Sequence, residues 1–245
     1  MGSIAFMALP ILACAALARH SLRVRGREAT LLFFLCAIVF SVIRGLVDAQ
    51  RPLAEVAQVS HLDLWLHEGR DFGLFMIMMP AVRAMIAYVG LLAGERFCAR
   101  RGGSGGGALR MCSIALLTYS LLGVLVECGG EALGWWTYRP TPEVNPSLLY
   151  HFLKGMNWGG GIVQAFFVAK LDTDRFERPV VVALNYMFGY FLVLTVCTLV
   201  NPGLRTILFA PFNLGIIVAG FFKQGPRLTP LRLPVGSPTT SNPVV

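Results

Sequence analysis

Seven apolar segments, separated by short polar loops, constrain the fold more than any other feature of this sequence. Most approach the ~20 residues that a helix needs to cross the ~30 Å core of a bilayer. Because a backbone within a bilayer must satisfy its own hydrogen bonds, such segments are expected to be helical. The seven segments are residues 3–18, 29–47, 72–93, 111–136, 148–169, 179–200 and 204–222. We therefore predict an all-α, multi-pass membrane bundle of about seven transmembrane helices.

The composition supports a membrane protein rather than a soluble domain. Hydrophobic residues make up 56% of the 245 residues and charged residues 14%, whereas soluble domains carry about 25% charged residues. The predicted membrane domain covers residues 1–222. Residues 223–245 are rich in Pro, Ser and Thr, and we predict a disordered cytoplasmic tail there.

Loops rich in Lys and Arg alternate along the chain with loops that contain few of them. The basic loops lie at 19–27, 96–110, 170–178 and 223–232, and the loops poor in Lys and Arg lie at 61–71, 137–147 and 201–205. Cytoplasmic loops carry the excess of Lys and Arg, so the amino terminus is predicted outside and the carboxyl terminus in the cytoplasm. Seven spans satisfy this arrangement. The stretch 52–70 is amphipathic and predicts a short helix in the outer membrane interface.

Several classes of function are disfavoured by what the sequence lacks. The net charge of +8 comes mainly from the loop arginines, and no nucleic-acid-binding motif accompanies it. The six cysteines are scattered singly, and the four histidines form no metal-ligand pattern. No P-loop, dinucleotide-binding motif or nucleophile elbow is present. We predict no metal, no cofactor and no nucleic-acid partner; the sequence sets no oligomeric state.

Four carboxyl groups lie in or beside the apolar segments: Asp48, Asp71, Glu127 and Glu131. A carboxylate in hydrocarbon costs several kcal/mol, about 2.5–3.5 on insertion scales, so each is a candidate functional residue. At 1.5 Å per residue, Glu127 is about 24 Å and Glu131 about 30 Å from the start of their segment at residue 111. The four candidate catalytic residues are thus predicted near one outer mouth.

The run ECGGEALGWWTY predicts the sharpest candidate site. Its residues Glu127, Glu131, Trp135 and Tyr138 follow helical spacing and would share one face of a single helix. Two carboxyls one turn apart in a low dielectric repel each other when both are ionised, so at least one is expected to stay protonated. A carboxylic acid beside aromatic rings is suited to acid-initiated carbocation chemistry, since ring quadrupoles stabilise cations.

Other aromatic and amide side chains extend the candidate site toward substrate binding. The candidate substrate-binding residues are Trp135, Trp136, Tyr138, Asn157, Trp158, Tyr186 and Tyr190. Structural interpretations remain open beside this one. Trp and Tyr near helix ends often form an interfacial belt, and the carboxylates have potential structural ion-pair partners in Arg44, Arg83 and Lys154.

The stretch EALGWWTY, residues 131–138, resembles the E-x-x-G…G-x-x-Y region of the membrane carotenoid-biosynthesis family that includes carotenoid hydratases. The predicted seven-span size and the acid-plus-aromatic character are similar to the small integral-membrane terpene cyclases of meroterpenoid pathways. The resemblance implies protonation of a terminal isoprene alkene or its epoxide. Capture of the cation by an internal alkene gives cyclisation, and capture by water gives hydration.

Two hypotheses follow from the sequence. The first is a metal-independent terpene cyclase-like enzyme of isomerase or lyase type, acting on a lipid-like prenyl or terpenoid substrate. In this enzyme Glu131 is the proton donor or its partner, and Glu127 or Asp48 adjusts the acidity of Glu131. The second is a non-enzymatic seven-helix carrier or receptor-like protein, in which Glu127, Glu131, Arg83 and Lys154 form a gating or proton-relay network.

Overall fold

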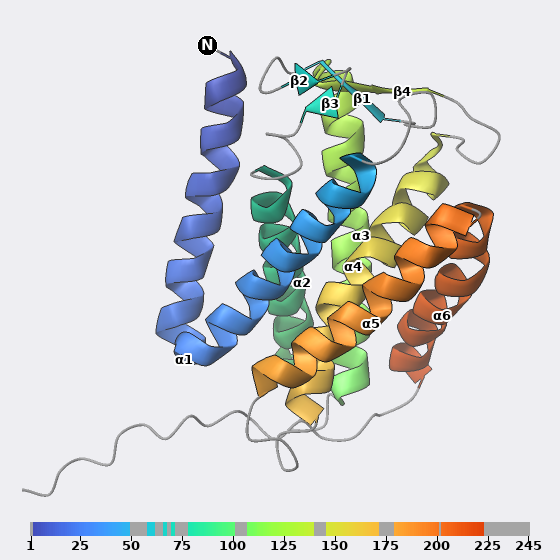
Figure 1. Cartoon of the computed structure of the whole chain (residues 1–245). Coiled ribbons are helices and arrows are strands. Elements are labelled where there is room, and N and C mark those ends of the chain that lie inside the picture. Colours follow the sequence, from blue (N-terminus) through green and yellow to red (C-terminus); the bar gives the residue numbers. More distant parts are fainter. Residues whose placement is uncertain are drawn as a thin grey trace, which may run out of the picture.

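The computed structural model is a helical bundle with two small sheets at one end (Figure 1). The helices are α1 Gly2–Ala49, α2 Met79–Arg100, α3 Ala108–Ala132, α4 Leu148–Leu171, α5 Pro179–Val200 and α6 Pro202–Phe222. The structure describes residues 2–49, 58–61, 66–67, 70–71, 78–100, 107–139, 146–171, 179–200 and 202–222. The predicted tail, 223–245, lies outside this range. The predicted helical bundle is confirmed.

Helix α1 contains the first two predicted segments, which meet at a sharp bend. Gly26 has φ 84° and ψ 178° there, a backbone conformation that is essentially restricted to glycine. Arg25, next to the bend, donates to Glu95 of α2, with Nη1 2.5 Å from Oε1. Burial alone would lower the pKa of Arg25, but its interactions with Glu95 and Tyr88 together outweigh burial and raise that pKa above its usual value. The bend is thereby fastened to α2, and the two halves of α1 diverge from it (Figure 1).

Substituting Gly26 is expected to weaken the fold. Gly26→Ala places a side chain in this glycine-only conformation, so we expect a loss of about 1–2 kcal/mol in the free energy of unfolding. Gly189→Ala in α5 is the control, because a Cβ there meets nothing within 4 Å. Chemical denaturation of the detergent-solubilised protein measures both. Equal stability of the two variants would contradict the prediction.

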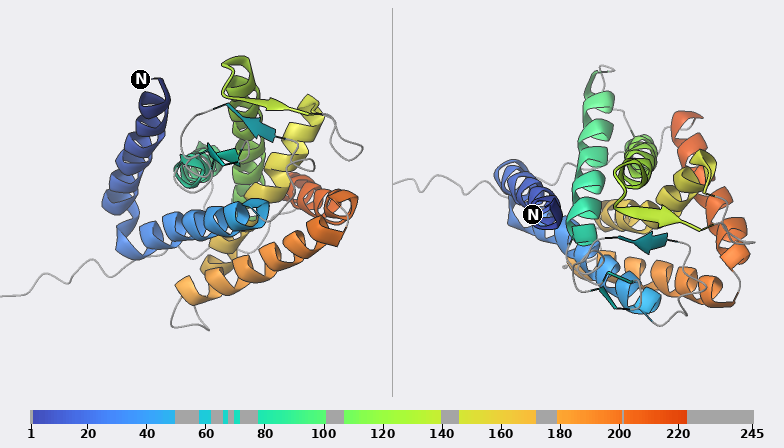
Figure 2. Two further views of the ribbon diagram at one scale, coloured as in Figure 1. Left: turned by 45° about the horizontal axis from the view of Figure 1, so that its top comes forward. Right: turned by 90° about the horizontal axis from the view of Figure 1, so that it is seen from above.

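Helix α3 packs against α2, α4 and α6. Seen from above, α2 and α6 lie on either side of it (Figure 2). Its contact with α2 is close, since a Cβ at Gly90 or Gly94 would lie only 2.6 or 2.7 Å from a carbonyl oxygen of α3. Glycines of this kind let two helix backbones approach each other, as in membrane helix pairs.

The strands close one end of the bundle. Strand β1, Gln58–Ser60, pairs antiparallel with β4, Trp136–Tyr138, with Ser60 opposite Trp136. Strands β2, Leu66–His67, and β3, Arg70–Asp71, form the second antiparallel pair. The sheets lie at the same end as the amino terminus (Figure 1). The interfacial helix predicted over 52–70 is wrong where this stretch is described, because its backbone there is paired as strands.

Two predicted helix boundaries also differ from the structure. The fourth segment was expected to be helical to residue 136, but α3 ends at Ala132 and the chain turns through Leu133 and Gly134. The third was expected to end at residue 93, whereas α2 continues to Arg100. Hydrophobicity does not mark the end of a helix: charged residues extend α2, and a turn ends α3 among apolar residues.

Among the described helices, α3 alone is both long and apolar enough to cross a membrane by length and composition. Shorter apolar stretches occur in α5 and α6, at Val181–Cys197 and Thr206–Phe222.

Candidate functional site

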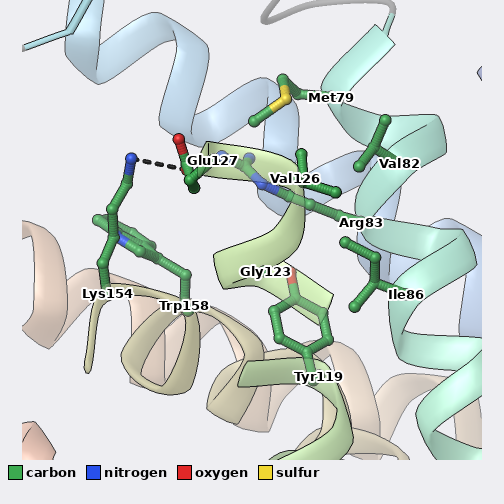
Figure 3. A pocket seen from close by; sticks show the side chains of 11 residues that line it. Met79, Val82, Arg83, Ile86, Tyr119, Gly123, Val126, Glu127, Lys154 and Trp158 are labelled. Atoms are coloured by element: carbon green, nitrogen blue, oxygen red, sulfur yellow. Dashed lines mark ion pairs between the residues drawn. The ribbon is translucent and has the colours of Figure 1, made fainter. Parts of the chain in front are cut away.

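A cavity of about 40 Å³ lies between α2, α3 and α4 (Figure 3). A cavity volume of roughly 10–15 Å³ is enough to hold one water molecule, so this cavity has room for a few waters. Figure 3 shows Arg83 extending from α2 toward Glu127, with Lys154 and Trp158 facing them from α4. The residues that line the cavity are Met79, Val82, Arg83, Ile86, Tyr119, Gly123, Val126, Glu127, Lys154, Gly155 and Trp158.

Glu127 is the buried carboxyl of this cavity and is 8% exposed. Its Oε1 lies 2.8 Å from Nζ of Lys154, and its Oε2 accepts a hydrogen bond from the hydroxyl of Tyr138. Lys154 also donates to that hydroxyl oxygen over 2.7 Å. The three side chains form a closed ring of charge-assisted hydrogen bonds, the strong kind in a protein interior. We call Glu127, Tyr138 and Lys154 the charged cluster.

Tyr138 reaches Glu127 because the chain folds back after α3. Gly134 has φ 69°, a left-handed conformation that glycine adopts without strain, and β4 returns along the end of the helix. Trp136 is fully buried over Gly130, and its Nε1 donates to the carbonyl of Glu127 over 3.2 Å. The anchored strand places Tyr138 beside the carboxyl group.

The environment of Tyr138 keeps its hydroxyl protonated. Burial, followed by the neighbouring Glu127 carboxylate, raises the pKa of Tyr138 far above its usual value. The phenol is therefore a hydrogen-bond donor across the physiological pH range, which matches its bond to Glu127.

Aromatic rings form one side of the site. Phe40 of α1 stacks on Trp158 and on Phe191 of α5, with ring centroids 5.4 and 3.7 Å apart. The guanidinium of Arg83 lies 4.9 Å from the centroid of Phe40. Arg83 also donates to Ser41 over 3.2 Å. The positive charge of Arg83 therefore lies against this aromatic surface, an arrangement that the quadrupole of the ring favours.

A second polar cluster lies deeper, between α4, α5 and α6. Asn213 donates to the Tyr190 hydroxyl over 3.0 Å and to Asn157 over 3.3 Å, and it accepts from Gln164 over 2.6 Å. Tyr186 donates to Gln164 over 2.5 Å. These interhelical bonds suit a role in joining three helices, the usual role of polar side chains in apolar bundles.

The predicted substrate-binding residues therefore divide between two places. Trp136 and Tyr138 pack at Glu127, and Trp158 lines the cavity. The three deeper ones, Asn157, Tyr186 and Tyr190, belong to the amide network. Trp135 is only half-buried and packs near Trp136, with ring centroids 6.1 Å apart.

Of the four predicted catalytic carboxyls, Glu127 and Glu131 have side chains that the structure describes, and Glu127 lines the cavity. Glu131 is exposed on the last turn of α3 and is not among the residues that line the cavity. The shared helical face is wrong, because Trp135 and Tyr138 follow the end of that helix. Asp48 is in the last turn of α1 and Asp71 is in β3, but their side chains lie outside the described part of the structure.

Two buried polar residues at these sites are not among the predicted catalytic or substrate-binding residues. His151, 2% exposed, packs its ring 4.8 Å from that of Tyr138. Asn213, fully buried, joins three helices. A single polar residue within an apolar segment can indicate a buried polar position. Neither His151 nor Asn213 has a helical spacing that links it to the carboxyls.

The comparisons with known proteins found no family model, no curated protein and no solved structure that matches this chain. The resemblance to membrane hydratases and terpene cyclases accordingly stays a prediction.

Proposed function

We propose that this chain is an integral membrane enzyme that protonates an alkene of a prenyl or terpenoid chain and so starts its cyclisation or hydration. The observation that carries the proposal is a buried carboxyl, Glu127, at a cavity that also contains the rings of Tyr119 and Trp158. Acid and aromatic surface are the two elements that this chemistry needs.

The charged cluster supplies the proton. With Glu127 and Lys154 paired as ions, the mobile proton resides on the amine. Burying two charges is expensive, so exclusion of water by an apolar substrate favours the neutral pair of carboxylic acid and amine. Proton transfer from Nζ of Lys154 to Oε1 of Glu127, across 2.8 Å, then produces the acid.

Glu127 gives up a proton at the start of the reaction and recovers one at its end. Glu127 adds the proton to the alkene, whose π bond breaks to leave a tertiary carbocation. Attack by an internal alkene and loss of a proton give a cyclic isomer. Capture by water and loss of a proton give an alcohol. In either case the Glu127 carboxylate recovers a proton, and the aromatic rings of Tyr119 and Trp158 stabilise the cation meanwhile.

Substrate entry requires the helices to separate. Ligand pockets commonly enclose about 300–1,000 Å³, whereas this cavity holds about 40 Å³. A lipid-like substrate would enter from the bilayer between α2 and α4. Exposed large apolar side chains on α5 and α6 support a membrane location, among them Phe188, Leu199, Ile207 and Phe222.

Removing the acid tests the proposal. Glu127→Gln keeps the size of the side chain but has no proton to donate, so product formation should fall about 100-fold or more. Membranes from a host expressing the chain are supplied with a prenylated or epoxidised precursor, and products are quantified by mass spectrometry. Glu131→Gln, one turn away and exposed, is the matched control and should retain activity. Undiminished product from Glu127→Gln would refute the role of Glu127.

The hydrogen-bonded ring of the charged cluster also favours a second function, a proton-coupled carrier. Lys154, Tyr138 and Glu127 are linked by short bonds through which a proton could pass. A carrier would show uptake into proteoliposomes that depends on a pH gradient. The enzyme would form product without any gradient.

A further inference from the structure

His151 carries an unsatisfied polar atom in the protein interior. The residue lies in the first turn of α4 and is 2% exposed. Within the described residues no hydrogen-bond partner approaches its Nδ1. A buried polar atom without a partner costs about 1–3 kcal/mol, and such atoms in native proteins usually bind a protein group, water or ligand.

The neighbours of His151 belong to the charged cluster. Its ring lies 4.8 Å from the ring of Tyr138 and 5.5 Å from that of Tyr150. Lys154 follows it by one turn of α4 and therefore lies on the same face of the helix. Lys154 also contacts Tyr138, with Nζ 5.0 Å from the ring centroid. Tyr138 is thus the common neighbour of His151 and Lys154.

No atom of the charged cluster is a hydrogen-bond partner of Nδ1 of His151. Both oxygens of Glu127 are engaged, one by Lys154 and one by Tyr138. The Tyr138 hydroxyl donates to Glu127 and accepts from Lys154. Nδ1 of His151 is therefore an unused hydrogen-bonding position beside the charged cluster.

We propose that His151 binds the hydroxyl group of a prenyl alcohol and so places the substrate chain beside the charged cluster. A hydroxyl both donates and accepts, so it fits Nδ1 whichever ring nitrogen carries the proton. The rings of Tyr138 and Tyr150 lie beside the imidazole and make its surroundings largely apolar. Leu148 and Leu149, both exposed in the same turn, provide an apolar surface for the chain. The inference rests on the proposed function and adds that one end of the substrate carries a hydroxyl group.

The test compares two ligands that differ in the hydroxyl group. Farnesol and the hydrocarbon farnesene are titrated into the intact chain in phosphatidylcholine nanodiscs, and binding is followed by tryptophan fluorescence. One hydrogen bond to a buried acceptor should make farnesol bind about three- to tenfold tighter than farnesene. In His151→Phe this preference should vanish, whereas His20→Phe, at an imidazole already bonded to Tyr88, should retain it.

The outcomes separate the proposal from its alternatives. A preference for farnesol that survives in His151→Phe overturns it, and so does a wild-type protein that binds both ligands equally, as expected when water alone occupies Nδ1. If His151→Phe does not fold, His151→Asn replaces it; Asn keeps a polar atom near Nδ1 and should show an intermediate preference. Full wild-type preference in His151→Asn would likewise count against a role for the imidazole. Binding needs no turnover, so a Glu127→Gln protein that prefers farnesol but forms no product leaves this inference intact.

Discussion

Replacing Lys154 by methionine is expected to destabilise the protein by about 3–5 kcal/mol, because Glu127 then remains buried without its cation. The Glu127 side chain is 10% exposed and the Lys154 side chain 16%, so water reaches neither charge freely. Tyr138 would still donate to Glu127, but one hydrogen bond from an uncharged hydroxyl does not replace an ammonium at 2.8 Å. Thermal and chemical unfolding in detergent measure the loss.

A double-mutant cycle isolates the interaction. Glu127→Gln alone leaves Lys154 without its anion, and the double variant Glu127→Gln with Lys154→Met removes both charges. Because a buried ion pair contributes little beyond a well-packed neutral pair, the double variant should be more stable than Lys154→Met. Additive losses would show that the two side chains do not interact in the folded protein. Lys154→Arg retains a cation and should recover part of the stability.

Gly130→Ala is expected to destabilise the protein by about 3 kcal/mol, the upper end for an overpacked core. A Cβ at this position would lie 1.9, 2.3 and 2.4 Å from three ring atoms of Trp136. Trp136 is fully buried, so its ring cannot move aside into solvent without losing its packing. Its displacement would lift β4 from α3 and separate Tyr138 from Glu127, so two hydrogen bonds to Glu127 would be lost as well.

The adjacent glycine provides the control. A Cβ at Gly129 meets nothing within 4 Å. Gly129→Ala should therefore stabilise α3 by about 0.5–1 kcal/mol, the helix preference of alanine over glycine. Two neighbouring substitutions of the same chemistry are thus expected to change stability in opposite directions. Equal effects in urea denaturation would show that Trp136 does not pack on Gly130.

The helices could be predicted because apolar run length is a property of consecutive residues. Seven runs correspond to the two halves of α1 and the five other helices. Glu127 was also accessible to sequence reasoning, since a carboxyl within an apolar run must find a partner. Lys154 was noted as one such partner from its place inside its own segment. Local composition therefore led to both members of the ion pair.

The fold-back after α3 could not be derived in the same way. Helical spacing favoured one face for Glu131, Trp135 and Tyr138, but Gly134 ends that continuity with a positive φ. The register of β4 depends on β1, some 75 residues earlier, and short strands carry little pattern of their own. Distant pairing thus decided which aromatic residue meets Glu127 and left Glu131 in the solvent-exposed last turn.

If the chain spans a bilayer, as proposed above, the contact between α2 and α3 bears on how it inserts. Gly90 and Gly94 bring the two backbones together near one end, and the β1–β4 ladder joins the segments flanking them at the other. An antiparallel pair tied at both ends suits insertion as a helical hairpin, in which Glu127 leaves the translocation machinery together with its neighbour rather than alone in lipid. A chain truncated after β4 should then integrate α2 and α3 as a pair, before α4 brings Lys154.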